Sequence, residues 1–381
     1  MGSEVRNFLE VPQEDQAAGW SNRRWVSAWL FMMCALLLVM IALGGATRLT
    51  GSGLSIMEWA PLTGTLPPFS EGEWHRLFDL YKTIPQYTLL NPDMDLAGFK
   101  RIFWLEWAHR FWGRMLGLAF IGPLVWFWAT QGIARWLRWR LAGLFVLGGL
   151  QGAVGWFMVA SGFLPDSTAV SPYRLVVHLG LAFVLYAALF WTGLQVWRPL
   201  PALAVARPLL RAWVGGTTVL LALTLLAGGF VAGLRAGFAY NSFPLMDGRL
   251  IPADYALLHP FVRNLTENVA TVQFNHRLLA SLTLLGAVGV LIGAWSVPRA
   301  HPARLPMLTL GVLAKIQYAI GVVTLLLVVP VDIGTLHQGM AVLVLSAALA
   351  ALHALRPPLA VPARRGGSDR SDACQPTQAS W

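Results

Sequence analysis

The chain has 381 residues, of which 56% are hydrophobic and only 12% charged. A soluble globule of this length needs more polar surface than these residues supply, so the composition predicts an integral membrane protein. The formal net charge of +10 does not indicate a nucleic-acid partner, because the basic residues form short separate clusters rather than one basic stripe.

The chain begins with a polar segment, 1–24, whose acidic residues argue against a mitochondrial transit peptide. Eight apolar runs follow, each long enough to cross a hydrocarbon core of about 30 Å. They are 25–44, 107–128, 141–160, 174–196, 211–232, 274–295, 306–329 and 334–354. The first is too long for a signal-peptide core, and we interpret it as an uncleaved anchor. Residues 355–381 are rich in Pro, Arg, Gly and Ser, which predicts a disordered tail.

The basic clusters indicate the topology. They precede the first run and follow the second, fourth, sixth and eighth, so they share one side if the runs alternate in direction. Short loops rich in Lys and Arg face the cytoplasm, which predicts cytoplasmic termini and external long loops at 45–106 and 233–273. We therefore expect a multi-pass protein of a bacterial inner membrane. Within the first long loop, the segment 71–82 has a helical pattern.

Two halves of the chain repeat the same order of residues. The order is a His-Arg pair, a glutamine among glycine and alanine, and a second histidine: His109-Arg110, Gln151 and His178, then His276-Arg277, Gln317 and His337. Four runs in each half make both halves enter the membrane in the same direction. The predicted fold is all-α, with eight transmembrane helices in two tandem, pseudo-symmetric four-helix bundles, 25–196 and 211–354, joined by an inner linker, 197–210.

The four repeated histidines begin runs that enter from the outer side, so they are expected at one depth. Neutral imidazole is a good axial ligand for heme iron, and two imidazoles on facing helices hold a porphyrin in a bundle. We predict one heme between His109 and His178 and another between His276 and His337. The alternative is that each histidine is an interfacial anchor or a hydrogen-bonded core residue. The remaining histidines have no counterpart and are interpreted as ordinary polar residues: His75, His259, His301 and His353.

One substitution breaks the repeat. Glu106 lies three residues before His109, on the same helix face, whereas Gln273 lies three residues before His276. A carboxylate beside a porphyrin can act as a base or stabilise a developing cation, while an amide only forms hydrogen bonds. The first half is therefore expected to perform the chemistry. The alternative is that Glu106 is a solvated interfacial acid.

Other polar residues have weaker indications. Arginines near the outer face are candidate partners for heme propionates, or for lipid headgroups: Arg48, Arg110, Arg235 and Arg277. Lys315 falls within the seventh run, and its role is left open between function and snorkelling toward the inner side. Gln151 and Gln317 are interpreted as packing residues, because small neighbours allow close helix approach.

Two other classes of membrane protein compete with an enzyme. A di-heme b-type electron-transfer cytochrome stacks its hemes across the membrane and needs histidines at two depths, whereas these four are expected at one. A transporter is compatible with the repeat, but transporters usually have broken helices near the midplane, and here the helix-breaking residues gather at the ends of the runs.

Several segments resemble the heme A synthase family. They are RLTGSGLS (48–55), EWAPLTGTLPP (58–68), EWAHRFWGRMLG (106–117), GLRAGFAYNSFPLM (233–246) and QFNHRLLA (273–280). The resemblance runs through all eight runs and is to the branch shared by mitochondria and related bacteria. Another branch has a cysteine pair in an outer loop, but the two cysteines here are Cys34, within a run, and Cys374, in the tail, so neither a thiol relay nor a disulfide is expected.

The resemblance implies an oxidoreductase that converts heme O to heme A for cytochrome oxidase. It oxidises a porphyrin methyl group to a formyl group through hydroxylated intermediates, with oxygen taken from water. It also implies that His109 and His178 flank the substrate heme, that His276 and His337 ligate a resident heme b, and that Glu106 is catalytic. The implied partners are a heme O-producing farnesyltransferase, oxidase assembly factors and membrane lipid, and a homo-oligomer is left open.

Overall fold

A computed structural model describes residues 22–60, 63–130, 132–197 and 207–356. Eight helices in these ranges are long and apolar enough to cross a membrane, which confirms the predicted spans. They are α3 (Arg23–Leu49), α5 (Leu96–Ala129), α6 (Arg135–Ala160), α7 (Pro172–Trp197), α8 (Pro208–Gly233), α10 (Val269–Gly293), α11 (Arg304–Leu326) and α12 (Val331–Ala354). Of the predicted tails and linker, residues 1–21, 198–206 and 357–381 lie outside the described ranges.

Short helices occupy the connections. They are α4 (Glu71–Tyr81), α9 (Asn264–Glu267), the 3₁₀ turns η1 (Thr63–Thr65), η3 (Ser161–Phe163), η4 (Ala236–Phe238), η5 (Phe261–Arg263) and η6 (Ala294–Ser296), and the π-helical turn η2 (Gln86–Leu90). The helix expected at 71–82 is confirmed as α4. Both long loops are shorter than predicted. The first is shortened because α3 continues to Leu49 and α5 already begins at Leu96, and the second because α10 already begins at Val269. We call the end of the bundle that carries loops 50–95 and 234–268 the loop end.

The seventh run was predicted to extend to residue 329, and this boundary is wrong. Helix α11 ends at Leu326, and Val328 and Val329 adopt positive φ values of 59° and 58°. β-branched residues rarely take this left-handed conformation, and the following Pro330 cannot donate a backbone hydrogen bond to a preceding turn. The apolar character of the segment concealed the turn, because hydropathy does not report backbone conformation.

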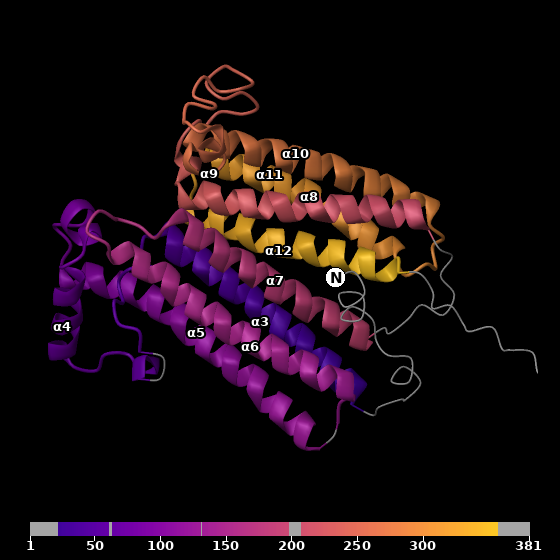
Figure 1. The fold of residues 1–381 in the computed structure, drawn as a ribbon, viewed down its shortest axis with the longest axis horizontal. Helices are drawn as coiled ribbons and strands as arrows, with labels where there is room; N and C mark the ends of the chain where they lie inside the picture. The colour runs from indigo at the N-terminus through magenta and orange to yellow at the C-terminus, as the bar shows by residue number, and fades with distance from the viewer. Residues whose placement is uncertain (1–21, 61–62, 131, 198–206, 357–381) are drawn as a thin grey trace, which may run out of the picture.

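The membrane helices form two rings. Contacts join α3, α5, α6 and α7 in one closed ring and α8, α10, α11 and α12 in another. The rings meet where α3 contacts α12, where α8 contacts α7 and where α7 contacts α12 (Figure 1). Helices α7 and α12 therefore lie at the centre of the molecule, and each ring has its own interior.

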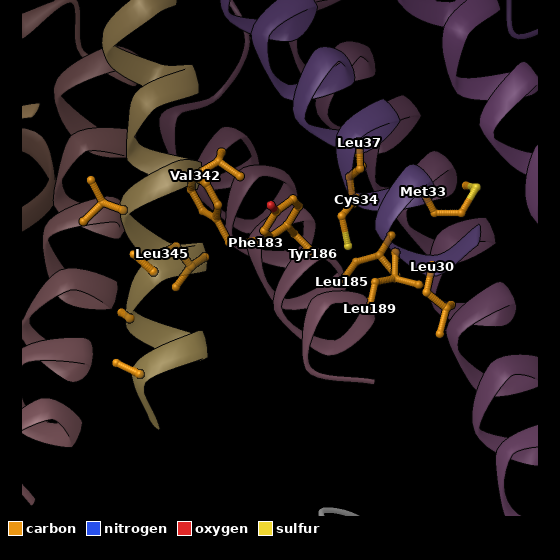
Figure 2. Packing of buried hydrophobic residues seen from close by; sticks show 14 of the residues in the cluster. Leu30, Met33, Cys34, Leu37, Phe183, Leu185, Tyr186, Leu189, Val342 and Leu345 are labelled. Carbon is orange, nitrogen blue, oxygen red and sulfur yellow. The ribbon is translucent and has the colours of Figure 1, made fainter. Parts of the chain in front are cut away.

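Tight apolar packing holds the centre together. Leu30, Cys34 and Leu37 of α3 lie close to Tyr186 and Leu189 of α7, and all five are at most 5% exposed (Figure 2). Across the ring boundary, the hydroxyl groups of Tyr186 and Ser346 are 2.7 Å apart. Lipid chains are as apolar as leucine, so such contacts stabilise the assembly through close packing and interhelical hydrogen bonds rather than through the exclusion of water.

Loop 50–95 has an ordered core of its own at the N-terminal end of α5. Trp74 of α4 packs edge-on against Phe103 of α5, with ring centroids 4.9 Å apart. Phe78 of α4 stacks on Phe99 of α5, with ring centroids 5.2 Å apart. Arg76 binds both Glu58 and Glu73, and its hydrogen bonds hold the pKa values of these two carboxyl groups below their ordinary range. The loop is therefore fixed over the loop end of the first ring.

Candidate functional site

The four repeated histidines lie in the loop-end part of the membrane helices. His109 is on α5 and His178 on α7, and the two are close enough for their charges to interact. The same holds for His276 on α10 and His337 on α12. The structure thus brings together the two pairs that the sequence predicted, one pair in each ring.

Each of these histidines lies against a glycine of a neighbouring helix. The partners are Gly44 for His109, Gly155 for His178, Gly228 for His276 and Gly321 for His337. A Cβ atom on any of these glycines would lie between 2.7 and 3.1 Å from the Cε1 atom of the imidazole. Real side-chain carbons rarely approach so closely, so glycine is what lets each ring lie against the backbone of α3, α6, α8 or α11.

A glutamine holds the second histidine of each pair. The side-chain amide of Gln151 donates to the carbonyl oxygen of His178, and that of Gln317 donates to the carbonyl oxygen of His337, both at 3.0 Å. In each case the glutamine lies one helical turn before the glycine that contacts the same histidine. The duplicated glutamines therefore fix the backbone at the histidine, which is consistent with a packing role.

The hydrogen bonding of the imidazole rings leaves them able to ligate heme iron. In the described residues, no protein group forms a hydrogen bond to Nε2 of any of the four rings, and Nδ1 of His109, His178 and His337 is buried without a partner. His276 differs, because its Nδ1 lies 3.1 Å from the carbonyl oxygen of Thr224. Such a bond requires the proton on Nδ1 and leaves the Nε2 lone pair available for a metal.

Glu106 is buried rather than solvated. It is 2% exposed, and its carboxylate accepts hydrogen bonds from Ser55 Oγ at 2.7 Å and from the backbone N–H of Ile56 at 2.9 Å. Its other oxygen accepts two hydrogen bonds from Arg110, at 2.6 and 3.0 Å. The alternative of a solvated interfacial acid is therefore wrong. Instead, this carboxylate ties the long loop to the helix that carries His109.

The second ring has the same arrangement with an amide in place of the acid. Gln273 is also 2% exposed and donates to the carbonyl oxygens of Ala236 and Ala239 at 2.8 and 2.5 Å. Its oxygen accepts a hydrogen bond from Arg277 at 3.0 Å. The residue one turn before the first histidine thus anchors the adjoining loop in both rings, but only the first ring places a carboxylate there.

The candidate arginines separate into two kinds. Arg110 and Arg277 are committed to loop carbonyl oxygens as well as to Glu106 and Gln273. Arg48, at the loop end of α3, donates to the carbonyl oxygen of Ala232 at the end of α8 and lies near enough to Arg235 for their charges to repel. Two neighbouring guanidinium groups at the junction of the rings favour an anion between them.

The other singled-out residues lie away from the histidine pairs. His75 and His259 are exposed in the loops, and His301 Nδ1 accepts a hydrogen bond from the backbone of Ala303. His353 packs its ring against Trp191 near the other end of the bundle. Lys315 is exposed on α11. The four histidines therefore stay interpreted as ordinary polar residues, and the role of Lys315 stays open between function and snorkelling.

Comparison with known proteins identifies the family. Residues 27–349 match the family model of the COX15-CtaA cytochrome oxidase assembly proteins. The chain belongs to this family. A heme A synthase of Granulibacter bethesdensis is 57% identical over 93% of this chain and 96% of the relative. A heme A synthase of Nitrosospira multiformis is 47% identical over 87% of this chain and 93% of the relative. Heme A synthase 2 of Acidiphilium cryptum is 47% identical over 90% of this chain and 95% of the relative.

Family membership confirms the resemblance seen in the sequence motifs, and the structure shows what some of those motifs do. Ser55 and Ile56 in the first long loop bind Glu106, although neither was singled out from the sequence. The glycines that face the histidines were also missed. Their signal was present, because Gly44 and Gly228 begin Gly-Gly pairs and Gly155 and Gly321 each follow a repeated glutamine by four residues.

Proposed function

We propose that this protein is a heme A synthase, an oxidoreductase that converts heme O to heme A by oxidising a porphyrin methyl group to a formyl group. Relatives with this name align over most of the chain. The observation that carries the proposal is the pair of similarly built histidine sites, of which only the first has a buried carboxylate one turn before its histidine. A di-heme electron carrier does not need this difference between its two sites.

The two rings are pseudo-symmetric halves with different occupants. His109 and His178 bind the substrate heme O, and His276 and His337 bind a resident heme b. The bond from Nδ1 of His276 to Thr224 supports a permanent ligand there, since it fixes the tautomer that presents Nε2. Arg48 and Arg235 bind propionate groups, because their two guanidinium groups lie near each other at the junction of the rings. Arg110 and Arg277 are less available, since each binds two loop carbonyl oxygens as well as the side chain of Glu106 or Gln273. The loop end faces outward from a bacterial inner membrane, and both termini are cytoplasmic.

The reaction takes two rounds of the same step. In each round the substrate methyl carbon loses two electrons and a proton, water adds to the resulting cation, and a second proton leaves. Two rounds give a hydrated aldehyde, which loses water to form the formyl group. When bound, heme b supplies a group that accepts and passes on electrons.

Glu106 stabilises the positive charge that develops on the substrate. Its carboxylate is held in place by Ser55, Ile56 and Arg110, so it needs no reorganisation during the reaction. Because all these partners are donors, acting as the base for the attacking water requires the carboxylate to release one of them. The arrangement therefore favours electrostatic stabilisation over proton transfer.

Replacing Glu106 with glutamine tests the assignment. We expect the E106Q variant, purified from cells that make heme O, to contain heme b and heme O but no heme A, whereas the wild-type protein also contains heme A. The pigments are separated by chromatography after acid extraction. The matched control is Glu71→Gln on the exposed surface of α4, which makes the same chemical change in the loop, and we expect this variant to keep its heme A. Full conversion by E106Q would exclude a catalytic carboxylate, and wild-type protein with heme b alone would favour an electron carrier.

A further inference from the structure

An apolar groove lies between α5 and α6, on the side of the first ring that faces lipid. Its volume is about 410 Å3, and its lining is formed mainly by Ile121, Leu124 and Trp128 of α5 and by Ala142, Phe145 and Val146 of α6. Val125, which also lines the groove, is 58% exposed, and Val146 is 69% exposed, so the groove opens into the membrane. It lies farther from the loop end than the histidine pair, on the helix that carries His109 and the helix that contacts His178.

The corresponding place in the second ring is closed. Leu291 follows His276 by fifteen residues, as Leu124 follows His109, and Gly311 precedes Gln317 by six residues, as Phe145 precedes Gln151. A Cβ on Gly311 would lie 2.5 Å from the Cβ of Leu291, so α10 and α11 are in direct contact. In the first ring the equivalent contact is replaced by the groove.

Two features of the first ring keep the helices apart. Phe145 occupies the position of Gly311, and its ring stacks on that of Phe120 with centroids 6.1 Å apart. Helix α5 also contains Pro123, where α10 has Val290 at the equivalent distance from its histidine. A bulky side chain and a proline at matched positions separate two helices that otherwise pack through glycine.

We propose that this groove binds the isoprenoid tail of the porphyrin substrate and thereby selects heme O for the first ring. This inference rests on the proposed function. Along α6, Val146 lies nine residues from Gly155, or about 14 Å, and along α5, Ile121 lies twelve residues from His109, or about 18 Å. A tail leaving the porphyrin edge and running away from the loop end reaches the groove within these lengths. The closed second ring suits heme b, which has no such tail.

Filling the groove tests the proposal. Ala142→Trp places an indole in the groove, and Gly143→Trp, the matched control, places one on the exposed lipid side of the same helix. For A142W purified from cells that make heme O, we expect the ratio of tail-bearing heme (heme O plus heme A) to heme b to fall about tenfold or more. A single methylene that does not fit an apolar pocket already costs about that much. G143W should keep the wild-type ratio.

Each outcome decides between the groove and its alternatives. An unchanged ratio in A142W would mean that membrane lipid alone occupies the groove, and the proposal would be wrong. If A142W loses heme b as well, the milder Ala142→Leu variant decides, because it copies Leu308 at the matched position of α11. Selective loss of tail-bearing heme in A142L supports the proposal, whereas an unchanged ratio or loss of both pigments overturns it. Absence of tail-bearing heme from the wild-type protein would instead contradict the proposed function itself.

Discussion

At the scale of single residues, Glu106 and Gln273 show that a side chain can hold a long loop to a membrane helix without carrying a charge. Both are buried one turn before a histidine, and both join an arginine to a long loop. The acid accepts hydrogen bonds from a loop hydroxyl and a loop N–H, while the amide donates to loop carbonyl oxygens. The second ring demonstrates that a neutral amide is sufficient to hold a loop. The negative charge of the first ring is therefore available for a role beyond anchoring.

The glycines that face the histidines give a prediction at the same scale. Gly321→Ala would place a Cβ 2.7 Å from Cε1 of His337 and push the imidazole away from α11. We expect heme b affinity to fall about tenfold or more, the usual effect of disturbing the groups that orient a metal ligand. The heme b content of the purified variant measures the loss of affinity. Gly339→Ala on α12 is the control, because its Cβ would meet open space. Equal loss of heme b in both variants would contradict a specific role of Gly321 in positioning His337.

At the scale of elements, α5 shows how one helix compensates for its own irregularity. Pro123 has no N–H, so the carbonyl oxygen of Ala119, one turn earlier, lacks its usual helical donor. The indole N–H of Trp29 on α3 donates to that oxygen at 3.1 Å. In the hydrocarbon region an unsatisfied carbonyl is costly, so this interhelical bond lets α5 carry a proline in the span beside the groove.

A double-mutant cycle measures this compensation. Trp29→Phe keeps an aromatic ring but removes the donor, and we expect it to lower the free energy of unfolding by about 1 kcal/mol. In a Pro123→Ala background the backbone N–H of residue 123 can satisfy Ala119, so the same tryptophan substitution should cost much less. Unfolding in mixed micelles provides the four stabilities. Equal costs in the two backgrounds would show that Trp29 acts through packing alone.

The elements also show what a sequence of this kind reveals. The eight spans and the four histidines could be predicted, because the bilayer demands long apolar runs and the repeat marks His109 and His276 as equivalent. The turn at Val328 could not, because its residues are as apolar as the helix before them. Three features also escaped prediction, since they depend on which helices become neighbours. They are the glycines that contact the histidines, the hydrogen bond from Trp29 to Ala119, and the groove at Phe145.

At the scale of the whole molecule, the two rings are separate in their interiors and joined along a narrow boundary. The three helix pairs that form this boundary are matched, since α3 contacts α12 as α8 contacts α7, with α7 against α12 between them. Each ring supplies both histidines of its own pair, and no histidine of a pair comes from the other ring. Loss of a ligand in one ring is therefore expected to leave the other ring intact.

Paired histidine variants test this independence. We expect His337→Ala to reduce heme b about tenfold or more while heme O remains bound and heme A is absent, because electrons from the first ring then have no acceptor. His178→Ala should show the reverse pattern, with heme b retained and tail-bearing heme lost. Acid extraction and chromatography of both purified proteins give the contents, and circular dichroism confirms that each remains helical. If both folded variants lost both pigments, the histidines would belong to one shared site, and the assignment of one heme to each ring would have to be abandoned.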